Sequence, residues 1–303
     1  MSLRVDPGGR LYGVVAGFIQ SAWGTNKGRF PGPQPVSIER RHFPLLKRDP
    51  YVVCEKTDGE RHMLVCVEVE KDRRAVLVNR ALEMRVVPLT LPPDAYKGTI
   101  LDGEVYEGTM LVYDALFVAG APVGHLFFLD RLEKIENFLK RMIVMKFDAF
   151  KLRLKTFHVV DDMDTFIDDY LPSVREEVDG LVFTPVNEPM RIGTHETMFK
   201  WKPQRMNTVD FALQRDCVRK GVWRLYVQDK GQLAYESETL QEEDFFEEGA
   251  IVECEYVPEV ERWRALKRRR DKTYPNNRRT FYATLRNIKE NIQMEEFRDL
   301  FRL

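Results

Sequence analysis

The chain has few cysteines and no long apolar run, and both absences exclude classes of protein. Its four cysteines, Cys54, Cys66, Cys217 and Cys254, are scattered and form no C-x-x-C pair. This spacing excludes a zinc ribbon and argues for a reducing compartment rather than a disulfide framework. No run approaches the roughly 18 apolar residues of a membrane-spanning helix, so we expect no membrane partner. With 303 residues, of which 44% are hydrophobic, the chain can bury a sizeable core in about two modules.

The sequence also lacks the common glycine-rich phosphate loops. It contains neither G-x-x-x-x-G-K-[ST] nor G-x-G-x-x-G, which excludes a P-loop and a Rossmann phosphate cradle. Any nucleotide chemistry must therefore take its positive charge from side chains.

Net charge is nearly absent, but charges of one sign gather in two segments. The 47 basic and 48 acidic residues leave a formal charge of −1. Residues 236–255 carry nine carboxylates and no basic side chain, whereas residues 261–279 carry nine lysines and arginines against two acids. Such a basic cluster can attract a polyanion, although a solvated face is the more frequent meaning of a charge run. Charge alone does not decide between the two.

The apolar pattern predicts two modules with a boundary near residue 207. In the first module it predicts strands at 51–54, 62–69, 75–79, 99–106, 180–185 and 197–202, and a helix at 126–145. After Pro203, five short strand candidates within about 80 residues are typical of a small barrel. The tail returns to helical spacing at Met294, Phe297, Leu300 and Phe301.

Three short segments could carry chemistry. Lys56-Thr57-Asp58-Gly59 follows a strand-like run, although an ordinary Asp-Gly turn explains it when it is taken alone. In Phe199-Lys200-Trp201-Lys202 the strand period of two places both lysines on one face, where an anion such as phosphate would relieve their repulsion. Asp102-Gly103-Glu104, like Asp179-Gly180, sets a carboxylate beside a glycine, which suits a divalent cation, a ribose hydroxyl or simply a β-turn. Together these residues suggest covalent catalysis by an amine that attacks an α-phosphate.

The order of these motifs resembles that of the lysine-dependent nucleotidyltransferases, and specifically of the GTP:RNA guanylyltransferases that build the mRNA cap. The six collinear segments are Lys56–Gly59, Asp102–Glu104, Val112–Ala115, Asp179–Gly180, Lys200–Lys202 and Arg269–Lys272. The lead-in Phe30–Ser37 resembles one found in capping enzymes and absent from ligases. Tyr113 stands where a phenylalanine is common. In length and tail the chain looks most like the single-function enzymes of large DNA viruses.

This resemblance implies an α+β fold in two domains. Residues 1–207 would form an ATP-grasp-like nucleotidyltransferase domain with antiparallel sheets, onto which the C-terminal helix 291–303 packs. Residues 208–290 would form a small OB-fold β-barrel. A closing clamp would bring the barrel over the nucleotide, with hinges near 203–207 and 287–292.

The implied reaction is mRNA guanylyltransfer in two steps. Lys56 would attack the α-phosphate of GTP, release pyrophosphate and carry GMP as a covalent lysyl-GMP intermediate, before the GMP passes to the 5'-diphosphate end of an RNA. Mg²⁺ or Mn²⁺ would assist, with Asp179 near the metal. The family's GTP-binding roles fall here on Arg61, Arg80, Glu104, Tyr113, Lys155, Lys200, Lys202, Asp210, Arg269 and Lys272, with Asp58, Gly59 and Asp271 as supporting motif residues.

Within that set, Arg61 and Glu104 would hold the ribose and Tyr113 would stack on guanine. Lys155 would donate to the guanine carbonyl oxygen, although a surface lysine is the plainer explanation of that residue. Lys200 and Lys202 would neutralise the α-phosphate, while Arg80 would reach toward the phosphates. Asp210 would position the leaving or accepting phosphates.

Two other functions fit part of the sequence. An ATP-dependent polynucleotide ligase uses the same lysine chemistry, and a non-catalytic RNA-binding module would use only the barrel and the basic tail. A capping enzyme of this length implies that an RNA triphosphatase and a cap methyltransferase are supplied in trans, or that the chain is a piece of a larger capping polypeptide. It also implies an intracellular location, in the nucleus or in a cytoplasmic viral factory.

Overall fold

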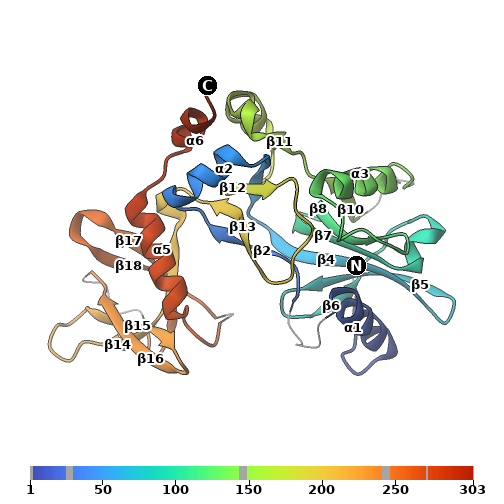
Figure 1. Ribbon diagram of the computed structural model, residues 1–303. Helices are drawn as coiled ribbons and strands as arrows, with labels where there is room; N and C mark the ends of the chain where they lie inside the picture. Colours follow the sequence, from blue (N-terminus) through green and yellow to red (C-terminus); the bar gives the residue numbers. More distant parts are fainter. Residues whose placement is uncertain (1–2, 25–29, 143–148, 241–245, 271, 303) are drawn as a thin grey trace. The chain divides into compact units, whose positions relative to one another are not determined.

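The computed structural model describes residues 3–24, 30–142, 149–240, 246–270 and 272–302 (Figure 1). Its contacts divide the chain into two compact units. The first comprises residues 1–36 and 46–200, and the second comprises residues 37–45 and 201–302. Each unit has its own core, so each is described by itself.

The largest sheet of the first unit has eight strands. In spatial order they are β1 (Leu3–Arg4), β6 (Met84–Val86), β5 (Asp72–Asn79), β4 (Glu60–Val69), β7 (Thr99–Tyr106), β8 (Thr109–Val118) and β10 (Lys151–Leu154), with β9 (Ala121–Pro122) pairing to β8. Neighbouring strands run antiparallel, except that β10 runs parallel to β8. The sheet is therefore built mainly from hairpins.

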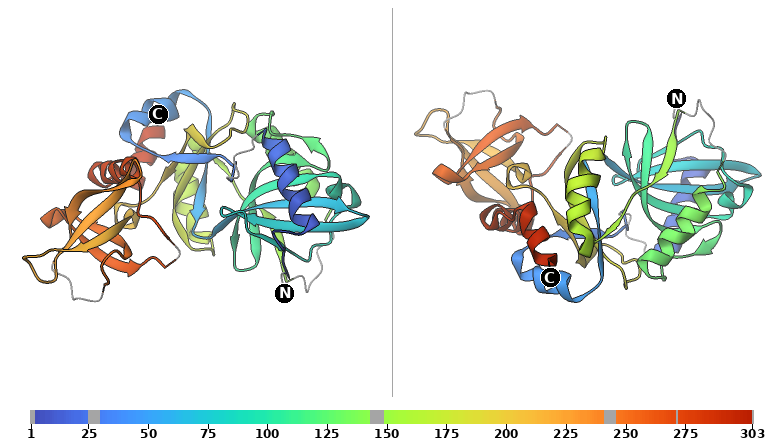
Figure 2. Two further views of the ribbon diagram at one scale, coloured as in Figure 1. Left: turned by 90° about the horizontal axis from the view of Figure 1, so that it is seen from below. Right: turned by 90° about the horizontal axis from the view of Figure 1, so that it is seen from above.

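Two helices bury the two faces of this sheet, because both sets of alternating side chains on its central strands are apolar. On β4, Met63 and Val65 pack in one core with α1 (Arg10–Trp23), whereas Leu64 and Cys66 pack in the other core with α3 (Phe128–Leu139). Figure 2 shows the two helices on opposite faces. A strand that is apolar on both sides belongs in the middle of such a three-layer arrangement.

A second sheet carries the Lys56–Gly59 motif. Its strands lie in the order β11 (His158–Val159), β3 (Tyr51–Thr57), β12 (Val178–Pro185), β13 (Thr194–Trp201) and β2 (Gln34–Ser37). β3 pairs antiparallel with both β11 and β12. Short helical segments of this unit are α4 (Met163–Thr165) and the π-helical turn Phe166–Tyr170, whereas α2 (Phe43–Arg48) has its first three residues in the second unit.

The second unit contains a five-stranded antiparallel sheet that closes on itself. The strands are β14 (Thr208–Arg215), β15 (Trp223–Asp229), β16 (Gln232–Glu238), β17 (Ile251–Val257) and β18 (Arg262–Arg268), in the spatial order β16-β15-β14-β17-β18. Thr239, just after β16, bridges to Trp263 of β18 and closes the barrel. Phe281 and Ile288 of helix α5 (Arg278–Glu290) enter its core. Order and closure are those of a small OB-type barrel.

Helix α6 (Met294–Phe301) belongs to the second unit by its contacts. Phe297 is fully buried and its ring lies 5.7 Å from the rings of both Phe43 and Trp201. Arg40 donates to both carboxylate oxygens of Glu296 at 3.0 and 2.8 Å. The helix thus packs on residues that precede the predicted boundary at 207, and the contacts group those residues with the barrel.

The predicted α+β class with antiparallel sheets and a small barrel is confirmed. The strands predicted in both modules are present, and the predicted helix 126–145 is α3, shorter at each end, with residues 143–145 outside the described part. Helices α1 and α5 were not predicted from the sequence. Among the described helices, none has the length and apolar character that crossing a membrane requires.

The packing of α6 gives a stability prediction. Phe297→Ala removes a fully buried ring that two other aromatic rings contact. We expect the free energy of unfolding to fall by about 3–5 kcal/mol, measured by urea denaturation. Tyr274→Ala, at a side chain that is 67% exposed, is the control and should change stability little. A loss below about 1 kcal/mol for Phe297→Ala would contradict the packing described here.

Candidate active site

Lys56 lies near the end of β3 and forms an ion pair across the sheet. Its Nζ donates to Asp179 Oδ1 at 2.8 Å and to Oδ2 at 3.1 Å. The pairing of β3 with β12 is irregular between Val178 and Gly180, and this irregularity sets Asp179 beside the lysine. The Lys56 side chain is 26% exposed and that of Asp179 9%, so the amine faces a partner and not bulk water.

A cavity of about 140 Å³ opens beside Lys56, within the first unit. Six residues predicted from the sequence line it: Lys56, Arg61, Arg80, Glu104, Tyr113 and Lys155. They come from six strands or the residues directly after them, so the fold gathers positions that are up to 99 residues apart. The remaining lining residues are Pro33, Pro35, Cys54, Thr57, Asp114, Phe128, Phe157, Val182, Thr184 and Met198.

The lining combines charged side chains with apolar ones, as small-molecule sites commonly do. Cys54, Phe128, Phe157, Val182 and Met198 supply apolar surface. Burial raises the pKa of the Cys54 thiol to about 12, so this cysteine is not a thiolate nucleophile at neutral pH.

Arg61 is the centre of a buried polar network. Its Nε donates to Asp102 Oδ1 at 3.0 Å, its Nη2 to Asp102 Oδ2 at 2.5 Å and its Nη1 to the carbonyl of Pro33 at 2.5 Å. The Tyr113 hydroxyl donates to the same Asp102 at 3.1 Å. The guanidinium also lies 5.1 Å from the ring of Phe30 and 5.8 Å from that of Tyr113. The proline-rich lead-in therefore supports the cavity wall.

Two motif glycines are required by close approach. A Cβ on Gly59 would lie 2.6 Å from the carbonyl oxygen of Val105 and 2.9 Å from Cγ of Glu104. A Cβ on Gly32 would lie 2.6 Å from Nη2 of Arg61. Real Cβ atoms essentially never approach other atoms this closely. The two glycines therefore allow the lead-in and the β3–β4 turn to lie against the cavity residues.

A second buried polar group lies on the face of β3 opposite to Lys56. Lys155 Nζ donates to Thr57 Oγ1 at 3.0 Å and lies 3.4 Å from Glu55 Oε1. The Tyr170 hydroxyl donates to Glu55 Oε2 at 3.0 Å. Lys155 is 6% exposed and lines the cavity, which excludes its reading as a surface lysine. The period of two along β3 could have revealed that Glu55 and Thr57 share a face, but the sequence analysis missed Glu55, Thr57 and Tyr170.

Asp114 is a further residue that the sequence analysis left without a role. It lines the cavity and accepts from Arg131 Nε at 2.7 Å and Nη2 at 2.9 Å. Arg131 is 2% exposed on α3, so this pair fixes the helix to β8 behind the cavity.

The two lysines of the Phe199–Lys202 segment follow the predicted alternation. Phe199 and Trp201 are buried, whereas Lys200 and Lys202 are half-buried. Neither lysine lines the cavity, although Met198, two residues before Lys200 on β13, does. Lys202 follows β13 and belongs to the second unit.

Three predicted residues of the second unit, Asp210, Arg269 and Lys272, lie together. Arg269 Nη1 donates to Asp210 Oδ1 at 3.0 Å, and Lys272 Nζ donates to Oδ2 of the same carboxylate. Asp210 is 4% exposed and lies on β14. Asp271 lies outside the described residues.

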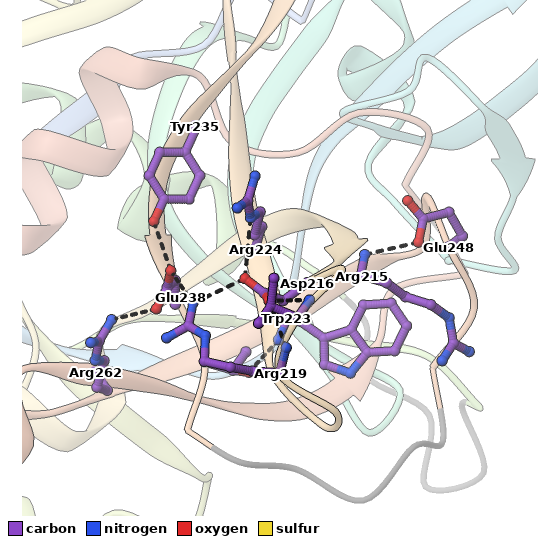
Figure 3. Close-up of polar contacts among 11 residues, drawn as sticks. Arg215, Asp216, Arg219, Trp223, Arg224, Tyr235, Glu238, Glu248 and Arg262 are labelled. Carbon is purple, nitrogen blue, oxygen red and sulfur yellow. Dashed lines mark hydrogen bonds and ion pairs between the residues drawn. The ribbon is translucent and has the colours of Figure 1, made fainter.

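The segregated charges of the sequence neutralise each other on the barrel. The pairs Arg262–Glu238, Arg264–Glu255, Lys267–Glu253 and Arg268–Glu247 have N–O distances of 2.9, 2.9, 3.3 and 2.8 Å. Figure 3 shows that Asp216 and Glu238 likewise gather Arg219, Arg224 and Arg262. The acidic and basic runs are therefore partners across strands, and the barrel is not a uniformly basic surface.

The pKa of Glu104 predicts that the stability of the protein depends on pH. Burial raises it above the usual 4.5, against the opposing effect of Lys56, Lys155, Arg61 and Arg80. Because folding favours the protonated Glu104 carboxyl, its contribution to the free energy of unfolding is fully present below pH 4.5. This contribution is lost as pH rises through the raised pKa. Glu104→Gln removes this cost, so its thermal midpoint should exceed that of the wild type at pH 8, by a margin that shrinks toward pH 5. Exposed Glu133→Gln is the control, and a lower midpoint for Glu104→Gln at pH 8 would refute the assignment.

Gly59→Ala tests the close approach of the β3–β4 turn. We expect a loss of about 1–3 kcal/mol in the free energy of unfolding, because the new Cβ must displace backbone or Glu104. Gly13→Ala on α1 is the matched control, since nothing lies within 4 Å of its Cβ. Helix propensity makes that change neutral or stabilising by up to about 1 kcal/mol. Equal effects of the two substitutions would show that Gly59 has no special role.

Comparisons with known proteins cover nearly the whole chain. The model of the mRNA capping enzyme catalytic domain matches residues 13–204, and that of the mRNA capping enzyme C-terminal domain matches residues 194–298. The chain is 28% identical to the mRNA-capping enzyme subunit alpha of Schizosaccharomyces pombe, over 92% of this chain and 81% of that protein. It is 29% identical to the mRNA-capping enzyme of Mus musculus, over 88% of this chain but only 48% of that protein.

Among solved structures, the chain is similar to the ATP-dependent DNA ligase of bacteriophage T7 in complex with ATP. The alignment has 14% identity and a TM-score of 0.43, and covers 83% of this chain and 98% of the ligase. The predicted likeness to enzymes of large DNA viruses stays a prediction. The family models span both units, and the chain belongs to the mRNA capping enzyme family of nucleotidyltransferases, the mRNA guanylyltransferases.

Proposed function

We propose that this chain transfers GMP from GTP to RNA through Lys56. The Lys56 amine, having lost a proton, attacks the α-phosphorus of GTP; an N–P bond forms and the bond to the pyrophosphate leaving group breaks. A terminal phosphate oxygen of a 5'-diphosphate RNA then attacks the same phosphorus; an O–P bond forms, the N–P bond breaks and the lysine amine is released. The observation that carries this proposal is the position of the Lys56 amine, in a cavity lined by five other residues of the predicted GTP-binding set.

The polar lining suits the parts of a nucleotide. We assign Glu104 and Arg61 to the ribose, with Arg61 oriented by Asp102, and Tyr113 to the guanine ring. Arg80 is exposed at the cavity and suits the phosphates. Lys200 and Lys202, on the polar side of their segment, would neutralise the α-phosphate. Asp179 holds the lysine amine in place before GTP binds.

We assign the phosphates that leave to the second unit. Departure of pyrophosphate is fastest when the charge on its oxygens is met as it develops. Arg269 and Lys272 supply two cations at one point, with Asp210 between them. A closing motion of the barrel about 203–207 and 287–292 would deliver them, and reopening would admit RNA.

Mg²⁺ or Mn²⁺ would add positive charge at the phosphates. Within the described residues, no group of three His, Cys, Asp or Glu side chains forms a metal site. Magnesium held mainly by substrate phosphates needs only one or two carboxylates, and Asp179 is the residue that suits it. We further propose that an RNA triphosphatase and a cap methyltransferase act in trans, and that the enzyme works inside the cell, in the nucleus or in a viral factory.

Labelling with GTP tests the reaction directly. We expect mass spectrometry to find a GMP-sized increment on Lys56 after incubation with GTP and a divalent ion, lost in dilute acid and reversed by pyrophosphate. Lys56→Ala should abolish it, because the change removes the cavity amine that donates to Asp179 at 2.8 Å. Lys134→Ala, at an exposed lysine of α3, should label like the wild type. Labelling by ATP alone would identify a ligase-type enzyme, and no adduct with either nucleotide would favour a binding module.

A further inference from the structure

A buried carboxylate lies on the opposite side of β3 from Lys56. Glu55 is 2% exposed, so its charge must be met by specific partners. A carboxylate in that position is costly unless it is paired and hydrogen-bonded. Its partners therefore indicate why the strand carries an acid there.

Glu55 has two partners, and each meets a different oxygen. Lys155 Nζ lies 3.4 Å from Oε1, and the Tyr170 hydroxyl donates to Oε2 at 3.0 Å. The aromatic ring of Tyr170 lies 4.6 Å from that of His158 and 5.6 Å from that of Phe166, which fixes its direction. The hydroxyl stays protonated at neutral pH, because burial and the charge of Glu55 raise the pKa of Tyr170 to about 12.

Lys155 is thereby held at three points. Its backbone N–H donates to the carbonyl of Val112 at 2.8 Å, next to Tyr113. Its ammonium meets Thr57 at 3.0 Å and Glu55 at 3.4 Å. An ammonium has three donors, so one remains for a ligand in the cavity that Lys155 lines.

We propose that Glu55 and Tyr170 are positioning residues that aim the Lys155 ammonium at the oxygen on C6 of the purine. This inference rests on the proposed function, because it concerns the base of the same nucleotide. An ammonium attracts a carbonyl oxygen and repels the amino group that adenine carries at that place. Glu55 and Tyr170 then set the preference for a 6-oxopurine without touching the nucleotide.

A buried pair with a merely structural role would make a different prediction. Its loss would weaken the binding of every nucleotide equally, through the stability of the cavity. A positioning role weakens only those nucleotides that carry the C6 oxygen. The comparison of guanine with 2-aminopurine, which lacks any group at C6, separates the two.

The test measures equilibrium binding without chemistry. The probes are the α,β-methylene triphosphates of guanosine and of 2-aminopurine riboside, which cannot release pyrophosphate. We expect Glu55→Gln to weaken the guanosine probe about tenfold and the 2-aminopurine probe less than about twofold. Tyr170→Phe, which keeps the ring and loses only the hydroxyl, should weaken the guanosine probe about threefold. If the Glu55→Gln protein does not fold, the Tyr170→Phe result distinguishes a positioning role from a structural one.

Tyr51→Phe is the matched control. It removes a tyrosine hydroxyl that donates to the carbonyl of Thr197 at 2.7 Å on the same sheet, away from Glu55. It should leave the ratio of the two affinities unchanged. Equal weakening of both probes by Glu55→Gln or Tyr170→Phe would overturn the proposal, and so would a wild-type protein that binds both probes equally. A wild type that prefers the guanosine probe but forms no adduct with GTP would refute the covalent reaction and leave this inference standing.

Discussion

The ion pair between Lys56 and Asp179 is the constraint on which the candidate active site depends. A lysine side chain has four rotatable bonds and, without a partner, samples many positions. Here a carboxylate across the sheet accepts from its amine at 2.8 and 3.1 Å, and the irregular pairing of β3 with β12 provides that carboxylate. The Lys56 amine is therefore held in one position at the cavity.

Buried charged pairs surround this point. Arg61–Asp102, Arg131–Asp114 and Lys155–Glu55 are all nearly inaccessible to solvent. Apolar side chains of the same size would often stabilise a fold as well as such pairs do. Their presence around one cavity agrees with the proposed function, in which the cavity binds a nucleotide. In that function, Arg61 and Lys155 would contact the nucleotide, while the Arg131–Asp114 pair fixes β8.

The motif residues could be predicted from the sequence, but the residues whose contacts hold them in place could not. Lys56, Glu104 and Tyr113 stand in short recognisable segments, and hydrophobic alternation located the strands that carry them. Glu55 and Tyr170 are 115 positions apart, and only the folded sheet brings them together. Helix α1 was missed because Gly13 and Gly17 weaken its helical pattern. The charge runs were visible in the sequence, but their mutual pairing required the register of β17 and β18.

Under the proposed function, the carboxylate of Asp210 would lower the entropic cost of binding a triphosphate at the barrel. Two long cationic side chains that wander independently must each lose conformational freedom when they close on an anion. Arg269 and Lys272 already converge on one nearly buried acid. Under the proposed function, a polyphosphate that replaced Asp210 as their partner would meet two cations already brought together.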